Sequence, residues 1–196
     1  VITSDRGLAG GLNINLFKAL SKSIQQYQDQ SVQAEFAVIG AKGVSFFKNF
    51  GSKVTSAVTD YGDKPTFEQL NAPVQAMLED YSNGKLDRIY VVYNQFVNAM
   101  TQKPIVNQLV PLPEGSFGDE ENGIQTELSW DYIYEPDIKT LIDELLGRYI
   151  ESIVYQAVME NIASEQSSRM VAMKAATDNA GDLINDLQLV YNKLRQ

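Results

Sequence analysis

The sequence predicts an α/β protein with a Rossmann-like, mostly parallel sheet and crossover helices, followed by one long C-terminal helix. Segments with strand character alternate with segments of helical periodicity along the first 136 residues, a pattern typical of βαβ units. The last sixty residues contain no proline and only two glycines, Gly147 and Gly181. We therefore expect an α/β domain over residues 1–136 and a single helix over residues 137–196.

The first βα unit occupies the beginning of the chain. Residues 1–4 have strand character, and a glycine-rich turn over 5–11 leads into a helix from Leu12 to about Tyr27. One face of this helix is apolar, as expected for a helix that covers a sheet. That face carries Leu12, Leu16, Phe17, Leu20 and Ile24.

Local signals mark the elements that follow. Gly51 is a plausible C-terminal cap for a helix over 42–50, and Thr66 is a plausible N-cap for a helix that ends near residue 82. The expected strands cover residues 34–40, 54–58, 87–93, 103–110 and 130–134. The acidic, glycine-containing stretch 114–127 is expected to form a surface loop.

The end of the C-terminal helix carries a heptad repeat of apolar residues, which is typical of a coiled-coil seam. One core position holds Met173, Ala180, Leu187 and Leu194, and the other holds Ala176, Leu183 and Val190. A seam requires a partner helix, and no other segment of this chain is long enough to supply one. We expect the partner to come from elsewhere.

Polar residues interrupt the apolar pattern at 164–169, where Gln166 and Arg169 stand at heptad core positions. Such residues either tune the register of a coiled coil or mark the point where the helix leaves the domain. The second interpretation is favoured, because the earlier apolar spacing fits packing on a domain. That spacing comprises Leu141, Leu145, Tyr149, Ile153 and Ala157.

Composition limits the possible functions. The formal net charge is −9, which argues against a surface for nucleic acid or anionic membrane. The chain has no histidine and no cysteine, so the usual general base and the usual transition-metal ligands are absent. We expect no catalytic site, no metal and no cofactor.

Two groups of residues invite functional interpretations. The glycines of the turn 5–11, Gly7, Gly10 and Gly11, could expose amides to a phosphate, but their spacing matches no nucleotide-binding motif, and close strand–helix packing is the favoured explanation. Tyr132 and Tyr134, with Glu135, stand where the domain meets the long helix, and either core packing or an exposed docking edge explains them. Asp5, Glu35, Asp87 and Asp131 are scattered acids whose spacing suggests no catalytic pair.

Two motifs give a resemblance to a known family. Residues 2–13 (ITSDRGLAGGLN) and 169–180 (RMVAMKAATDNA) resemble signatures of the gamma subunit of bacterial F-type ATP synthase, in the same order and with the same separation. The similarity extends over the whole chain. Ala9 stands where the family often has cysteine.

The resemblance implies a non-catalytic rotor subunit of the central stalk, which couples proton flow to conformational change at the catalytic beta subunits and helps regulate ATPase activity. The long helix would form an antiparallel coiled coil with the subunit's own N-terminal helix, which is expected to be missing here, as is the C-terminal tip. Implied partners are the alpha and beta subunits, the epsilon subunit and the c-ring, with no nucleic acid. The implied location is peripheral, on the cytoplasmic face of the bacterial inner membrane.

The resemblance also assigns contacts. Tyr132, Tyr134 and Glu135 would meet the c-ring and epsilon, whereas Arg195 and Gln196 would contact a beta-subunit loop. Two alternatives stay open. One is a nucleotide-binding α/β enzyme that uses the turn from Gly7 to Gly11, and the other is a homodimeric coiled-coil scaffold.

Overall fold

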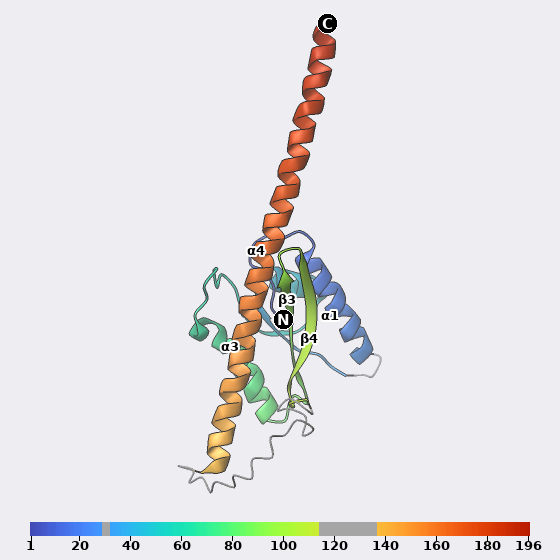
Figure 1. The fold of residues 1–196 in the computed structure, drawn as a ribbon. Coiled ribbons are helices and arrows are strands. Elements are labelled where there is room, and N and C mark those ends of the chain that lie inside the picture. The colour runs from blue at the N-terminus through green and yellow to red at the C-terminus, as the bar shows by residue number, and fades with distance from the viewer. Residues whose placement is uncertain (29–31, 114–136) are drawn as a thin grey trace, which may run out of the picture.

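A computed structural model describes residues 1–28, 32–113 and 137–196 as an α/β domain with one very long helix along its side (Figure 1). The lower part of this helix lies against the domain, and the upper part projects away from it. Within the described part of the chain, no helix combines the length and the apolar character that a membrane crossing requires.

The sheet is built around the first residues of the chain. Strand β1 (Phe36–Ile39) pairs in parallel with β2 (Val54–Val58). Ile2 forms a parallel bridge with Ile39, and its N–H donates to the carbonyl of Val92 on β3 (Ile89–Asn98) at 2.8 Å. The first segment therefore lies between β1 and β3 and joins them, which confirms the predicted α/β class.

Strand β4 (Thr101–Val110) pairs antiparallel with β3, so these two strands form a hairpin rather than another parallel unit. The turn chemistry explains the hairpin. The side-chain oxygen of Asn98 accepts hydrogen bonds from the N–H groups of Met100 at 3.0 Å and Thr101 at 2.8 Å. An asparagine that binds the backbone two and three residues onward closes a tight turn.

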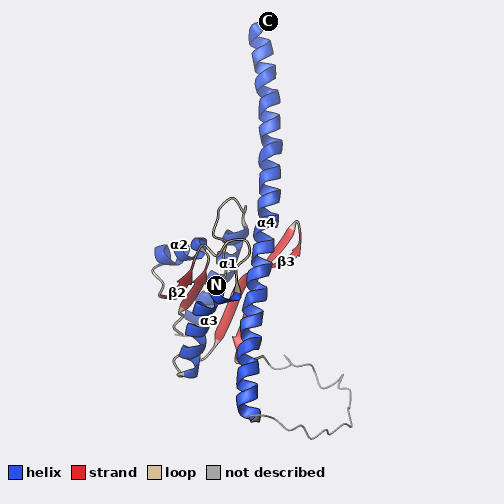
Figure 2. Cartoon of the chain, turned by 90° about the vertical axis from the view of Figure 1, so that its left-hand side faces the viewer, coloured by secondary structure: helices blue, strands red, loops and turns tan. Residues whose placement is uncertain are grey.

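Helices lie on both faces of the sheet (Figure 2), and the side chains between the layers form two cores. Helices α1 (Leu12–Gln28) and α2 (Ala41–Phe50) pack on one face, while α3 (Phe67–Ser82) and α4 (Ile138–Arg195) pack on the other. The first core contains Leu16, Leu20, Ile24, Phe36, Val38, Phe47 and Val92. The second contains Ile2, Ile39, Tyr61, Leu70, Val91, Leu109, Ile150, Val154, Ala157, Val158 and Ile162.

The predicted helix ends agree with the structure. Gly51 follows α2 in the left-handed conformation with φ of 70°, and its N–H donates to the carbonyl of Phe47. Thr66 is the N-cap of α3, and its N–H donates to the side chain of Gln69 at 3.0 Å. The α4 N-cap is Asp137, whose carboxylate accepts from the backbone N–H of Thr140 at 2.9 Å, and this bond lowers the pKa of Asp137.

Helix α4 contains 58 residues and therefore extends roughly 87 Å. Its contact with the domain begins near residue 150, where Glu151 accepts a hydrogen bond from Gln75 of α3 at 2.9 Å. The expected packing of Leu145 is wrong, because this side chain precedes the contact region and is 59% exposed. Helical periodicity identifies an apolar face, but it does not say which turns of a long helix meet the domain.

Candidate functional site: the projecting helix and its base

The projecting part of α4 is an isolated helix in this structure. Every residue from Met173 to Gln196 is exposed. The seven predicted seam residues lie on this one helix, and the large ones are substantially open to solvent, for example Leu183 at 61%, Leu187 at 60% and Leu194 at 82%. Exposed apolar surface of this extent marks an interaction site.

A second row of apolar side chains lies beside the seam. Met170, Ile184 and Tyr191 stand at the heptad position that follows the second core position, and Leu189 is also exposed. This row makes the apolar surface wider than the two-position stripe of a simple two-stranded coil. The sequence reasoning missed it, although the same seven-residue spacing could have found it.

Acidic residues occupy another part of the projecting helix. Asp178, Asp182 and Asp186 follow one another at intervals of four residues and are all exposed. Residues four apart lie on the same side of a helix, so these carboxylates form an acidic row. Gly181 lies among them, and a Cβ built on it would have no neighbour within 4 Å.

The polar stretch predicted at 164–169 lies at the base of the projecting part. On the side of the β3–β4 hairpin, the hydroxyl of Ser167 donates to the carbonyl of Ala99 at 2.7 Å. The hydroxyl of Ser168 donates to the side-chain oxygen of Gln102 at 2.9 Å. The hairpin tip is therefore hydrogen-bonded to the helix at the point where the helix leaves the domain.

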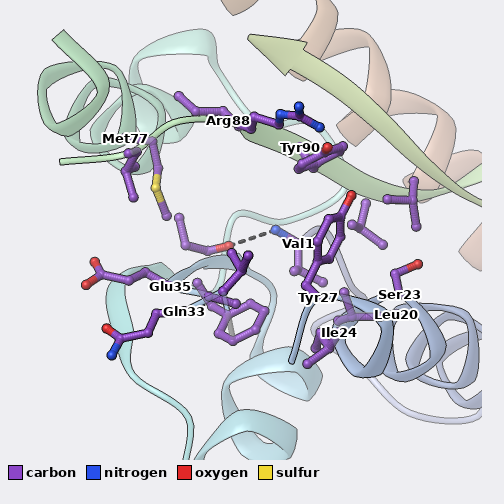
Figure 3. Close-up of a pocket in the computed structure, with 18 of the residues that line it drawn as sticks. Val1, Leu20, Ser23, Ile24, Tyr27, Gln33, Glu35, Met77, Arg88 and Tyr90 are labelled. Atoms are coloured by element: carbon purple, nitrogen blue, oxygen red, sulfur yellow. Dashed lines mark hydrogen bonds between the residues drawn. The ribbon is translucent and has the colours of Figure 1, made fainter. Parts of the chain in front are cut away.

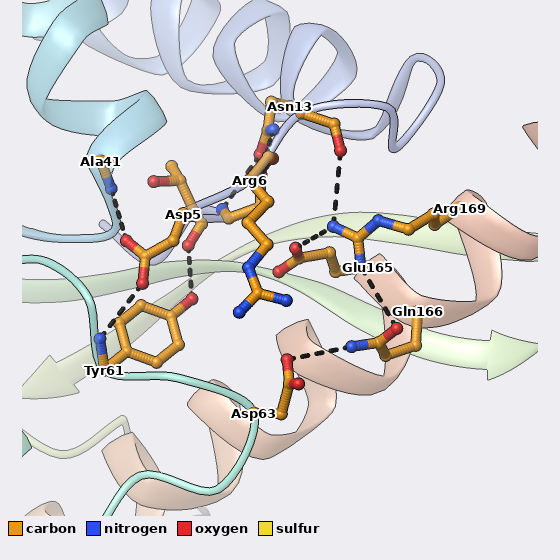
Figure 4. A network of polar contacts seen from close by, with 12 residues as sticks. Asp5, Arg6, Asn13, Ala41, Tyr61, Asp63, Glu165, Gln166 and Arg169 are labelled. Atoms are coloured by element: carbon orange, nitrogen blue, oxygen red, sulfur yellow. Dashed lines mark hydrogen bonds and ion pairs between the residues drawn. The ribbon is translucent and has the colours of Figure 1, made fainter.

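Another set of contacts holds the opposite side of the same turn (Figure 4). Gln166 donates to Asp63 in the loop before α3 at 3.1 Å. Arg169 forms an ion pair with Glu165 and donates to the carbonyl of Gly7 at 3.4 Å. The base of the projecting helix is thus bound by polar groups from three separate segments.

The glycine-rich turn packs against α4. Gly10 has φ of 55°, in the left-handed region that favours glycine, and a Cβ added there would lie 4.0 Å from the Cβ of Ala172. The positive φ of Gly10 is consistent with the expected tight turn, whereas 4.0 Å is an ordinary van der Waals distance and the neighbour is α4 rather than the helix that follows the turn.

The neighbouring N-terminus of α2 is already occupied by a carboxylate (Figure 4). The two oxygens of Asp5 accept from the N–H groups of Ala41 at 2.8 Å and Tyr61 at 3.2 Å. In α/β proteins, anionic ligands bind at helix N-termini beyond the carboxyl ends of the strands. Here the protein's own Asp5 fills that role at α2.

Among the described residues, the other predicted acids, Glu35 and Asp87, do not form a catalytic constellation. Glu35 is bound by Lys53 and Thr55, and the hydrogen bond from Lys53 is the larger cause of the lowered pKa of this carboxyl. Asp87 lies near the start of β3 and is exposed, and Asp131 lies outside the described residues. In the part of the chain that the structure describes, no cluster of three or more acidic side chains could hold a metal ion.

A cavity of about 450 Å³ lies between α1 and the strands (Figure 3). Ile24 and Tyr27 line one side, and Arg88 and Tyr90 line another. The rings of Tyr27 and Tyr90 are 5.8 Å apart, and their hydrogen bond raises the pKa of Tyr27. No sequence motif indicated this cavity, because its lining comes from α1, α3, three strands and the loops that precede β1 and β3.

Several predicted residues have no structural test here. Tyr132, Tyr134 and Glu135 lie outside the described residues, as do the expected strand 130–134 and the loop 114–127. Arg195 is the last residue of α4, and Gln196 is its C-cap. Both are exposed, and their assigned contacts stay predictions.

Comparisons with known proteins agree with one another. The family described as ATP synthase matches residues 1–196. The chain is 93% identical over its full length to the ATP synthase gamma chain of Psychrobacter arcticus and 61% identical to that of Acinetobacter baumannii. It spans 67% of the length of each of these relatives.

Two solved structures share the fold. The central stalk and c-ring structure of Tetrahymena thermophila mitochondrial ATP synthase matches with a TM-score of 0.64 and 23% identity, over 90% of this chain and 74% of that one. The rotor of Euglena gracilis mitochondrial ATP synthase matches with a TM-score of 0.60 and 22% identity, over 99% and 71% of the two chains.

Proposed function

The chain belongs to the ATP synthase gamma-chain family, and we propose that it is the rotor subunit in the central stalk of an F-type ATP synthase. The observation that carries this function is the projecting half of α4, which presents an exposed apolar heptad far from the domain that anchors it. A shape of this kind suits a subunit that reaches from one part of a complex into another.

The partner of the seam is a second helix of the gamma subunit itself. We assign the N-terminal helix of the full-length subunit to this position, in an antiparallel pair with α4. The relatives are longer than this chain, so they have residues to supply such a helix. Two packed helices resist bending and twisting better than one, which is what a rotating shaft requires.

The coupling is mechanical. Rotation of the c-ring, driven by protons, turns the α/β domain at the foot of the shaft, and α4 turns with it inside the ring of alpha and beta subunits. The asymmetric shaft presents a different face to each beta subunit in turn, which changes the three catalytic sites in sequence. The same contacts allow the subunit to help regulate ATPase activity.

The subunit itself is proposed to be non-catalytic. Residues 1–196 contain neither histidine nor cysteine to serve as a general base or thiol nucleophile. The Asp5 carboxylate binds the α2 N-terminus, which a nucleotide phosphate would otherwise use. Catalysis then belongs to the beta subunits.

The contacts at the two ends of the shaft are also part of the proposal. Tyr132, Tyr134 and Glu135 would lie at the foot against the c-ring and the epsilon subunit, and Arg195 and Gln196 would face a beta-subunit loop. The subunit would then be held on the cytoplasmic face of the bacterial inner membrane through the c-ring alone.

A reversible cross-link tests the rotor function. Residues 1–196 contain no cysteine, so Arg195→Cys introduces the one thiol in this part of the subunit. In the assembled complex, a disulfide from this thiol to a cysteine placed in the facing beta-subunit loop should abolish steady-state ATP hydrolysis, and reduction should restore it. Lys48→Cys, on the exposed surface of α2, is the matched control.

The outcomes separate the possibilities. Full turnover with Arg195→Cys cross-linked to beta would contradict rotation of this subunit. Failure of that cross-link to form, when the same pair of reagents labels both thiols, would contradict the contact assigned to Arg195.

A further inference from the structure

We propose that three buried polar residues, Asn94 on β3 with Asn161 and Ser164 on α4, fix the axial register of α4 on the α/β domain. These three residues are called the register cluster below. The proposal concerns positioning, and its mechanical consequence rests on the proposed rotor function.

The register cluster is a set of direct hydrogen bonds between one strand residue and one turn of the helix. The side-chain nitrogen of Asn94 donates to the Oδ1 of Asn161 at 3.0 Å, and the backbone N–H of Asn94 approaches the same oxygen at 3.4 Å. The hydroxyl of Ser164 donates to the carbonyl of Asn94 at 3.0 Å. Both helix residues are fully buried, and Asn94 is 1% exposed.

The backbone N–H and carbonyl of Asn94 on β3 are available to bind α4. Pro104 lies opposite Asn94 on β4, and proline has no N–H to donate to a neighbouring strand. The carbonyl of Asn94 accepts from Ser164 of the helix. A buried carbonyl and N–H require partners, so a β3 residue opposite a proline suits attachment to α4.

Apolar packing surrounds the register cluster. Tyr61 belongs to the same hydrophobic core as Val158 and Ile162 of α4, and its hydroxyl donates to the carbonyl of Thr3 at 2.7 Å. Tyr61 is 5% exposed and Thr3 is fully buried. Asn161 takes part in the register cluster through its Oδ1 alone, because its Nδ2 makes no hydrogen bond to any described residue.

Apolar packing alone specifies the register poorly. The buried apolar residues of α4 include Ile150, Val154, Val158 and Ile162, which are four residues apart and similar in shape. A slide of α4 by four residues, about 6 Å along its axis, would place most of them where another β-branched residue had been. The apolar contacts at these four positions would change little.

The same slide would break the register cluster. Asn161 and Ser164 would leave Asn94, and the residues that replaced them would be Ala157 and Glu160, or Glu165 and Ser168. In one direction Ala157 would leave the N–H groups of Asn94 without an acceptor, and in the other Glu165 would bring a carboxylate into the core beside Asn94. Either change is costly for buried groups. Single buried polar residues specify register in coiled coils for the same reason.

The axial register of α4 can be measured from which pairs of introduced cysteines form a disulfide. In the full-length gamma subunit within the assembled synthase, Ala99→Cys is combined in turn with Ala163→Cys, Ser167→Cys or Val171→Cys. These three helix positions are four residues apart, and the Ser167 hydroxyl is 2.7 Å from the Ala99 carbonyl. With the register cluster intact, we expect a disulfide only for the pair 99 and 167.

The perturbed protein carries Asn94→Leu, Asn161→Leu and Ser164→Ala. We expect its 99–167 cross-link to fall to about half, with the remainder at 163 or 171, because two registers become similar in energy. Gln166→Ala, which removes the exposed bond to Asp63, is the control and should leave cross-linking at 167 alone. Exclusive cross-linking at 167 in the triple variant would overturn the proposal.

If the triple variant does not assemble, a single substitution provides the test. Ser164→Ala adds no volume and removes one donor from the register cluster, so a minor product at 163 or 171 should appear above the background of the parent. Its absence would overturn the proposal. The cross-link pattern reports register whether or not the subunit rotates, whereas ATP-driven proton pumping in the same samples reports the rotor function separately.

Discussion

Replacing Leu183 and Leu187 with aspartate should prevent the projecting half of α4 from pairing with another helix. These side chains are 61% and 60% exposed in the unpaired helix. Full burial of a leucine is worth about 1.5–3 kcal/mol, so the exposed fraction corresponds to about 1–2 kcal/mol for each residue on pairing. The double substitution removes about 2–4 kcal/mol of favourable burial and adds the cost of desolvating two carboxylates.

A loss of this size weakens pairing by at least about tenfold, since about 1.4 kcal/mol corresponds to a factor of ten. The assay is ATP-driven proton pumping by inverted membrane vesicles that contain the assembled complex. We expect Leu183→Asp/Leu187→Asp to abolish pumping or to block assembly.

The matched control adds the same two charges elsewhere on the same turns of the helix. Asn185→Asp and Gln188→Asp lie on exposed positions outside the seam, so they should leave pumping nearly unchanged. Normal pumping by Leu183→Asp/Leu187→Asp would refute the reasoning. An equal loss of proton pumping in both double variants would refute it as well. The loss would then result from the added negative charge rather than from the removal of apolar side chains from the seam.

Three further predictions concern the domain. Gly40→Ala should destabilise the protein by about 2–5 kcal/mol in urea unfolding, because Gly40 has φ of 111° and a new Cβ would lie 2.2 Å from the carbonyl oxygen of Thr3; a loss below about 1 kcal/mol would contradict the geometry. Burial raises the pKa of the Tyr61 hydroxyl in the folded state. The contribution of the neutral hydroxyl to the free energy of unfolding is therefore fully present below the pKa of about 10 that tyrosine has in the unfolded chain, and it is lost as the pH rises above that value. Tyr61→Phe should therefore show a smaller drop in the urea midpoint between pH 9 and about pH 11, and an unchanged drop would show that Tyr61 is not responsible. Titration calorimetry with ATP, ADP and NAD should show no saturable binding at the turn from Gly7 to Gly11, whereas micromolar binding abolished by Gly10→Val would favour the enzyme alternative.

Much of the fold could be predicted because its signals are local. Thr66 caps α3 and Gly51 ends α2 through groups within a few residues of each helix end, so the sequence alone contains the reason. The length of α4 also follows from a local property, the absence of proline over sixty residues.

Other features depend on contacts between distant segments. The direction of β4 follows from the hydrogen bonds that Asn98 makes, which strand periodicity does not encode. Leu145 and Ile150 lie on the same helix, yet Ile150 is buried and Leu145 is exposed. The partners of Asn161 come from β3, 67 residues earlier in the chain, and no spacing rule connects them.

The polar contacts at residues 164–169 also determine how far the end of α4 moves when the helix tilts. Among the described residues, Arg169 is the last residue of α4 that hydrogen-bonds to the domain, at the carbonyl of Gly7, and Arg195 lies 26 residues further along the helix. The part of α4 beyond Arg169 is about 39 Å long and is supported by the domain at one end only. A tilt of about 10° at its fixed end would displace its tip by about 7 Å, roughly the diameter of a side chain. Small changes at the support are therefore amplified at the far end, and the stiffness of the support decides how accurately the tip is placed.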